Sequence, residues 1–274
     1  MIDLHLHTTA SDGRSTPEQL VARLIAAGIR TCAITDHDTT AGLARATAAA
    51  AGTPLAVIAG IEITAVHAGV DVHMLGYFFD PENAEVAAFL VAQRADRVRR
   101  VLEMLERLDS LGVVVDRAPI LKQATEAAGR AVGRPAIARL LVAHGHVRTI
   151  ADAFDQYLGT GRPAFVARRG IEPGEVIDLI GRAGGLVSFA HPGKLGHDEL
   201  LPELARRGLA AIEVFHPDHD AEAIARYTDL ARDLGVGVSG GSDYHGPGSG
   251  RAEALGTVTL PEPCFDDLRS RVPS

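Results

Sequence analysis

Two histidines near the N-terminus, His5 and His7, have the spacing of metal ligands. Residues two apart in a β-strand point to the same face, so both imidazoles can reach a single ion. A Ser-Asp-Gly turn follows and offers the carboxylate of Asp12. Each feature alone has an ordinary alternative, since surface histidines and aspartates in turns are common.

A second cluster, Asp36-His37-Asp38, directly follows an apolar stretch. Three ionisable groups in a row at a strand end need partners if they are buried, because an unpaired buried charge is costly. A metal ion would supply such a partner. The alternative is a helix-capping aspartate beside a solvated histidine.

Glu62 and His73 lie within apolar segments that should be buried. An acid inside a buried strand is rare unless it is paired or binds a ligand. Glu62 is therefore either a metal ligand or one half of a buried salt bridge. Asp71 shares a strand face with His73 and could orient it through a hydrogen bond.

The same pattern returns later in the chain, where His191 ends one apolar segment and Asp243 and His245 follow another. Most of the clusters among the 12 histidines follow apolar runs. Because α/β sheets and barrels place their sites at the carboxyl ends of strands, the set predicts a metal site. Imidazole and carboxylate without thiolate favour Mn, Fe or Zn over Mg and Ca, which prefer oxygen.

These clusters need strands to position them. Short apolar or β-branched runs alternate with Ala- and Leu-rich helical stretches, which is typical of βαβ units in an α/β fold. A hydroxyl and a proline at Thr16 and Pro17 start a helix that stops at Gly28. The pattern predicts strands at residues 2–7, 31–35, 55–58, 60–64, 70–78, 186–189, 211–215, 235–239 and 256–259.

The pattern changes in the middle of the chain. Residues 83–111 predict one long helix, and residues 119–158 predict several shorter ones. The shorter helices should be broken at Gly129, Gly133 and Gly145. We therefore expect a metal-binding core of residues 1–80 and 164–274, interrupted by a helical insertion of residues 81–163.

Composition excludes several classes of protein. The chain of 274 residues has a formal charge of −8 and a mean hydropathy of +0.10. The acidic balance argues against duplex DNA as a partner, because duplex DNA needs a broad basic face. Cys32 and Cys264 are too few for a disulfide framework. We see no membrane-spanning run and no secretion signal, so we expect a cytoplasmic protein without a membrane partner.

The chain resembles the PHP (polymerase and histidinol phosphatase) family. Its motifs occur in the family's order: HLHTTASDG, TDHD, GIE, His73, AHPG and GSDYH. The resemblance covers residues 1–76 and 186–256. It implies a distorted (β/α)7 barrel with an inserted helical lid, and it points to the branch of 3′,5′-nucleoside bisphosphate phosphatases and 5′-to-3′ exoribonucleases.

The resemblance also implies a trinuclear metal centre. One ion is assigned to His5, His7, Glu62 and Asp243. A second ion, reached through Glu62 as a bridge, is assigned to His73 and His191. The third ion is assigned to Asp12, His37 and His245. The resemblance favours Mn(II), with Fe(II) and Zn(II) as alternatives.

The expected activity is that of a metal-dependent phosphoesterase. Two ions about 3.5–4 Å apart can share a hydroxide that is nucleophilic at neutral pH, so no serine or cysteine nucleophile is needed. The expected substrate is a small phosphorylated nucleotide or a short 5′-phosphorylated RNA. The nucleotide is expected to be a nucleoside 3′,5′-bisphosphate, from which the 3′-phosphate is hydrolysed. Glu62 would be central to catalysis, and Asp38, His216 and His219 are alternative donors of a proton to the leaving group.

Arginines in the insertion are the candidates for binding phosphate. Arg97 and Arg100 are three residues apart, and Arg134 precedes another predicted helix. Guanidinium groups pair bidentately with phosphate oxygens. The alternative is a solvated helix face, in which Arg99 and Glu103 form an i,i+4 pair. The family resemblance favours contact with the substrate.

Two other functions remain open. A histidinol-phosphate-type phosphomonoesterase would need only a shallow pocket for one phosphate. A non-catalytic, metal-dependent nucleotide sensor would bind without turnover. Several arginines in the insertion favour a substrate with two phosphates, and the complete set of ligands favours an enzyme.

Overall fold

The computed structural model describes residues 1–125 and 133–273, which form two compact units. The first unit comprises Met1–Leu90 and Gly170–Ser274, and the second comprises Val91–Arg169. The insertion expected from the sequence spans residues 81–163. Gly129, one of the expected helix breaks, lies outside the described residues.

The first unit is built on one seven-stranded sheet, in which strands adjacent in sequence are adjacent in space. The strands are β1 (Ile2–Asp3), β2 (Thr31–Ile34), β3 (Ala56–His67), β4 (Val70–Tyr77), β5 (Leu186–Phe189), β6 (Ala211–Phe215) and β7 (Gly237–Gly240). Strands β1 to β3 are parallel, and so are β5 to β7. Only β4 is antiparallel to both of its neighbours in this sheet of the described chain.

The N-terminal segment closes the sheet onto its last strand. The amide of Leu4 donates a hydrogen bond to the carbonyl of Gly240 (3.1 Å). Leu6 forms a further parallel bridge with Tyr244, just beyond the last strand. The chain approaches so closely that a Cβ at Gly241 would overlap the backbone nitrogen of His5. The result is a nearly closed barrel, and the expected α/β barrel fold is confirmed.

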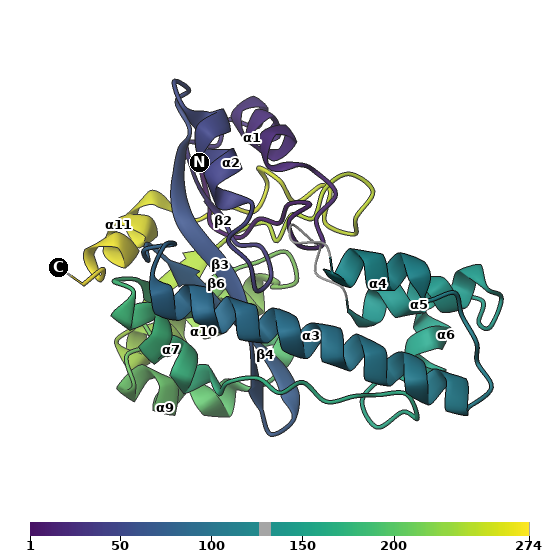
Figure 1. Ribbon diagram of the computed structural model, residues 1–274. Coiled ribbons are helices and arrows are strands. Elements are labelled where there is room, and N and C mark those ends of the chain that lie inside the picture. The colour runs from purple at the N-terminus through teal and green to yellow at the C-terminus, as the bar shows by residue number, and fades with distance from the viewer. Residues whose placement is uncertain (126–132, 274) are drawn as a thin grey trace. The chain divides into compact units, whose positions relative to one another are not determined.

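The first unit also contains helices, several of which pack on its strands (Figure 1). They are α1 (Pro17–Ala26), α2 (Leu43–Ala50), α7 (Pro173–Arg182), α8 (Pro192–Leu195), α9 (Leu201–Arg206), α10 (Ala221–Leu234) and α11 (Glu262–Ser270), with a 3₁₀ turn at Asp198–Leu200. α1 starts with a capping box, in which Thr16 and Gln19 exchange hydrogen bonds between side chain and amide. α7 packs on β5, and its buried Ile180 lies in the same core as Val187 and Phe189.

The second unit is helical. The long helix α3 (Ala84–Ser110) begins in the first unit and is followed by α4 (Ala118–Thr125), α5 (Arg134–Ala143), α6 (Ile150–Ala153) and a π-helical turn (Phe154–Leu158). Leu105 and Leu108 of α3 share a buried core with Ile137 and Leu141 of α5. α5 lies between Gly133 and Gly145, where the sequence predicts breaks. In the part of the chain that the structure describes, no helix meets the length and apolarity needed to cross a membrane.

Four predicted strands differ substantially from the structure. Residues 55–58 and 60–64 join in one strand, β3, because Gly60 allows the carbonyl of Ile34 to approach closely. Residues 256–259 contain the end of a turn and an irregular segment instead of a strand, and Gly256 has a left-handed φ of 77°. The predicted strand 2–7 is shortened, because β1 ends at Asp3. Beyond it, the amide of Leu6 donates to the hydroxyl of Thr35 (2.9 Å) instead of to a carbonyl of the neighbouring strand.

Candidate metal centre

All nine candidate ligands gather at the carboxyl end of the parallel strands, in overlapping groups whose donor atoms lie within 4.8 Å of one another. The residues that follow β1, β2, β5 and β7 are His5, His7, Asp12, His37, His191, Asp243 and His245. Glu62 lies within β3, where its backbone bridges to His37. Because β4 runs in the opposite direction, His73 reaches the same end from the first half of its strand.

The carboxylate of Glu62 lies at the centre of the cluster and is almost completely buried. One oxygen, Oε1, lies 2.8 Å from Nδ1 of His73 and 3.1 Å from Nε2 of His191. The other oxygen, Oε2, lies 3.1–3.3 Å from ring nitrogens of His5, His7 and His37. Each oxygen therefore has its own set of imidazoles, which is the geometry of a carboxylate that can bridge two ions.

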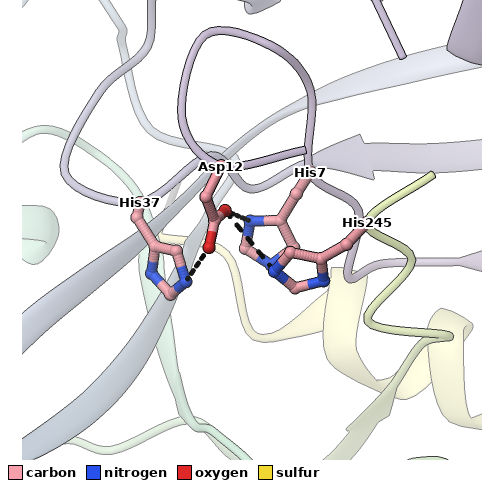
Figure 2. A group of neighbouring side chains, drawn as sticks. All are labelled: His7, Asp12, His37 and His245. Carbon is pink, nitrogen blue, oxygen red and sulfur yellow. Dashed lines mark ion pairs between the residues drawn. The ribbon is translucent and has the colours of Figure 1, made fainter. Parts of the chain in front are cut away.

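Asp12 forms the second point of convergence (Figure 2). Its carboxylate lies between three imidazoles, with separations of 3.8 Å to Nδ1 of His7, 3.9 Å to Nε2 of His37 and 3.4 Å to Nε2 of His245. These distances exceed those of ordinary hydrogen bonds and leave room for an ion. The other ring nitrogen of His245 donates to the backbone carbonyl of Asp243 (2.8 Å), which leaves Nε2, the atom that faces Asp12, available to a metal ion.

The two carboxylate oxygens of Asp243 contact different groups of side chains. Oδ1 lies 3.4 Å from Nε2 of His5 and 3.2 Å from Nε2 of His7. Oδ2 lies 3.3 Å from Nε2 of His216 and accepts a hydrogen bond from Nε of Arg251 (2.9 Å). Asp243 therefore presents one fixed oxygen to the imidazoles of the N-terminal segment.

Several buried imidazole nitrogens of the described chain have no hydrogen-bond partner: both nitrogens of His7, and Nδ1 of His73 and of His191. The nitrogen of His73 is close to Glu62 but lacks the alignment that a hydrogen bond needs. Buried lone pairs left in this way are costly unless a cation compensates them. These side chains fit divalent metal ions that accept mixed nitrogen and oxygen ligands.

Charges within the cluster shift the protonation of its members. Burial opposes ionisation of Glu62, but the surrounding imidazoles, His37 foremost, outweigh it and hold the pKa of the carboxyl well below its usual range. Burial lowers the pKa of His37 and of His191 to about 4. At neutral pH Glu62 is thus ionised and these two imidazoles are neutral, which are the forms that bind metal ions.

Glu213 is a buried carboxylate that the sequence analysis missed. Its Oε1 lies 2.8 Å from Nδ1 of His5, and its Oε2 accepts a hydrogen bond from the amide of His191 (2.8 Å). An ionised carboxylate only accepts hydrogen bonds, so Nδ1 of His5 carries the proton and Nε2 faces Glu62. A signal was present in the sequence, because Glu213 lies between apolar residues of β6 as Glu62 does in β3.

The two aspartates that flank His37 are held by hydrogen bonds. Asp36 accepts hydrogen bonds from Thr8 and Ser11 at 2.6–2.7 Å, which fixes the loop that carries Asp12. Asp38 accepts a hydrogen bond from an amide of β3 (2.9 Å). These contacts tie the loops after β1 and β2 to the barrel.

His216 and His219, the histidines considered as proton donors, use both of their ring nitrogens. Nδ1 of His216 accepts a hydrogen bond from the amide of Asp218 (3.1 Å), so Nε2 carries the proton and faces Asp243. Nδ1 of His219 donates to a backbone carbonyl of β6 (2.8 Å), and Nε2 accepts from the amide of Gly193 (3.1 Å). Both rings act as connections within the first unit.

A cavity of about 610 Å³ lies over the cluster, within the size range of small-molecule sites. Its walls outside the nine candidate ligands include Arg14, Lys194, Asp218, Ser249 and Arg251. Among the described residues that line it, Asp38, His216 and His219 are absent. The cavity is thus acidic and imidazole-rich at the cluster and carries basic groups in its walls.

The three arginines expected to bind phosphate lie in the second unit. Arg97 and Arg100 are on α3, and Nε of the buried Arg100 donates to a backbone carbonyl of the same unit (3.2 Å). Arg134 begins α5, and its guanidinium lies over the rings of Phe154 and Phe165, 5.9 and 5.6 Å from their centroids. Cation–π contacts of this kind restrict the orientation of Arg134.

The fold and the cluster define the first unit as a PHP-type barrel. The family model described as the PHP domain matches residues 3–157, and the chain belongs to this family. It is 31% identical to the 3′,5′-nucleoside bisphosphate phosphatase of Chromobacterium violaceum, over 99% of this chain and 97% of that protein. It is 35% identical to the 5′-3′ exoribonuclease Rnm of Escherichia coli, over 89% of this chain and 85% of that protein.

A solved structure agrees with these relatives. A Bifidobacterium adolescentis protein, proposed to be a metal-dependent phosphoesterase, matches with a TM-score of 0.86 and 35% identity, over 100% of this chain and 96% of that one. The family resemblance predicted from the motifs is confirmed.

Proposed function

We propose that the protein is a metal-dependent phosphoesterase that hydrolyses the 3′-phosphate of nucleoside 3′,5′-bisphosphates. The observation that carries the proposal is Glu62, whose two oxygens face separate sets of imidazoles beneath a cavity of nucleotide size. The relatives support it, because one is named for this reaction and another is a 5′-3′ exoribonuclease.

Three Mn(II) ions are the proposed cofactors, with Fe(II) and Zn(II) as alternatives. The first would be held by His5, His7, Glu62 and Asp243, the second by Glu62, His73 and His191, and the third by Asp12, His37 and His245. Bound divalent ions activate water and neutralise charge on a phosphoryl group. The chain's own contribution is to hold these ligands rigidly, as Glu213 does for His5 and His216 does for Asp243.

The metal content can be measured directly. Protein loaded with Mn(II) and freed of excess metal is expected to contain more than two ions per chain by elemental analysis, because nine ligands exceed the needs of one ion. A single ion per chain in fully active protein contradicts the trinuclear proposal.

The substrate is tested by comparing specificity constants of the Mn-loaded protein. The panel consists of nucleoside 3′,5′-bisphosphates, mononucleotides, 5′-phosphorylated RNA oligomers and histidinol phosphate. The proposal expects the bisphosphates to be preferred, with short RNA as the second substrate. A preference for histidinol phosphate contradicts it. Binding without phosphate release above a blank identifies a sensor instead.

The arginines of the second unit are proposed to bind the phosphate that is not hydrolysed. Arg134→Ala is expected to lower kcat/KM for a 3′,5′-bisphosphate about ten- to a hundredfold more than for a simple phosphate monoester, since charge-assisted hydrogen bonds contribute roughly 1.5–3 kcal/mol. Arg97→Ala and Arg100→Ala should show the same bias. Remote phosphate binding can also raise turnover by positioning the reacting group.

A matched control lies on the same helix. Arg139 is exposed on α5, so Arg139→Ala removes an equal charge and should leave the ratio of the two specificity constants unchanged. Equal losses of activity on both substrates in Arg134→Ala would show that Arg134 does not select the bisphosphate.

A further inference from the structure

The cavity needs a group that can donate a proton to the leaving group, and the sequence candidates do not supply one. Asp38, His216 and His219 are absent from its described lining residues. Both histidine rings also use their two nitrogens in hydrogen bonds within the first unit. The other polar side chains in the cavity wall are the remaining protein groups to consider.

Most of the other polar side chains in the wall are unsuited to this role. Arg14 and Arg251 carry guanidinium groups, a side-chain type that does not serve as a general acid. Asp218 is an acceptor, since it forms an ion pair with Arg251. The hydroxyl of Ser249 donates to the carbonyl of Gly246 (2.7 Å).

Lys194 is the remaining candidate. This exposed residue lines the cavity, and no hydrogen bond or ion pair joins its ammonium group to a described residue. The chain has only two lysines, Lys194 and Lys122, against 25 arginines. Arginine supplies almost all of the positive side chains in this chain. A lysine differs from arginine because its ammonium group can release a proton, and Lys194 places such a group beside the cluster.

Hydrogen bonds fix the backbone at the start of α8, the short helix that carries Lys194. The amide of His191 donates to Glu213 (2.8 Å), and the amide of Gly193 donates to Nε2 of His219 (3.1 Å). The amide of Lys194 then closes the turn on the carbonyl of His191 (3.0 Å). A Cβ at position 193 would overlap the ring of His219, so the turn rests directly on that histidine. These contacts fix the backbone that carries Lys194, which limits the entropy lost when its side chain is positioned.

We propose that Lys194 is a catalytic residue, whose ammonium contacts the phosphate ester and donates a proton to the leaving-group oxygen. The oxygen of water bonds to phosphorus and releases a proton to solvent, and the bond from phosphorus to the ester oxygen breaks with its electron pair left on that oxygen. The proton from Nζ converts this oxygen to a hydroxyl, and Nζ regains a proton from solvent. The inference rests on the proposed function, since it requires an ester in this cavity.

The test compares two substrates that differ in one atom. One is a nucleoside 3′,5′-bisphosphate, and the other carries sulfur in place of the 3′ bridging oxygen. A thiolate leaves without protonation because its pKa is several units below that of an alcohol. Lys194→Met should lower kcat about 10²–10⁴-fold on the oxygen ester, the usual range for general acid catalysis, and less than about tenfold on the sulfur ester.

Two further variants separate proton donation from charge. Lys194→Arg keeps the positive charge but does not release a proton, so it should remain defective on the oxygen ester. Lys122→Met removes the only other lysine and should match the wild-type protein on both esters. Restoration by Lys194→Arg, or equal losses on the two esters in Lys194→Met, would overturn the inference.

Measurements apart from activity exclude a structural explanation. Lys194→Met should retain the wild-type melting temperature and Mn content, while calorimetry should show weaker binding of inorganic phosphate to the Mn-loaded protein. Loss of Mn from the variant would overturn the inference by making Lys194 a support of the cluster. Wild-type protein that hydrolyses neither ester refutes the proposed function itself, which is a separate outcome.

Discussion

Glu62→Gln is expected to lower turnover by at least about a thousandfold, equivalent to about 4 kcal/mol of transition-state stabilisation. Glutamine keeps the shape of the side chain but removes the charge and replaces one oxygen with an NH₂ group. The imidazoles of His5, His7 and His37, or those of His73 and His191, then face a donor instead of an acceptor. Two ions would lose their shared ligand at once.

Turnover and melting temperature must be measured together for this variant. If Glu62 were only half of a buried ion pair, stability would fall while the folded fraction kept its activity. Glu18→Gln serves as the control, because Glu18 forms an exposed pair with Arg45 (2.8 Å) away from the cluster. The control should leave turnover unchanged.

Removal of divalent metal is expected to abolish more than about 99% of the activity and to lower the melting temperature by about 5–10 °C. A ligand present at 100 times its dissociation constant stabilises the folded state by about 2.7 kcal/mol, and each kcal/mol corresponds to roughly 2–4 °C at this chain length. Without metal, the buried ring nitrogens of His7, His73 and His191 would have no cation to bind, and they have no hydrogen-bond partner in its place.

The measurement uses dialysis against a chelator, followed by thermal unfolding and assay before and after metal is restored. Mn(II) should recover both properties, and Mg(II) should recover less because imidazole is a poor ligand for it. Chelated protein that keeps its melting temperature and activity would contradict a metal-dependent mechanism.

The sequence predicts well which candidate ligands lie together, because their signal is local. Each lies beside an apolar run, and the carboxyl ends of parallel strands necessarily meet at one edge of the sheet. Glu62 stands out as an acid among apolar neighbours. The sequence also predicts His73, although the reversal of β4 that brings it to this edge depends on the hairpin between β3 and β4.

The supporting contacts were harder to predict because they join distant parts of the chain. His5 and Glu213 are 208 residues apart, and their contact depends on how β1 and β6 are placed in the closed barrel. His216 and His219 carry the residue type expected of catalysts, but hydrogen bonds to Asp218 and Gly193 engage their rings within the first unit. Residue type predicts what a side chain can do, and its partners determine what it does.

Closure of the barrel between Leu4 and Gly240 also constrains the order of events during synthesis. The ribosome releases His5 and His7 first, whereas Asp243 and His245 follow only after almost the whole barrel has emerged. The N-terminal segment has no neighbour on one side until then, and such long-range closure is slow compared with helix formation. In a growing chain, the candidate metal centre is therefore completed late. Until then, His5 and His7 lack the neighbouring side chains of Asp243 and His245.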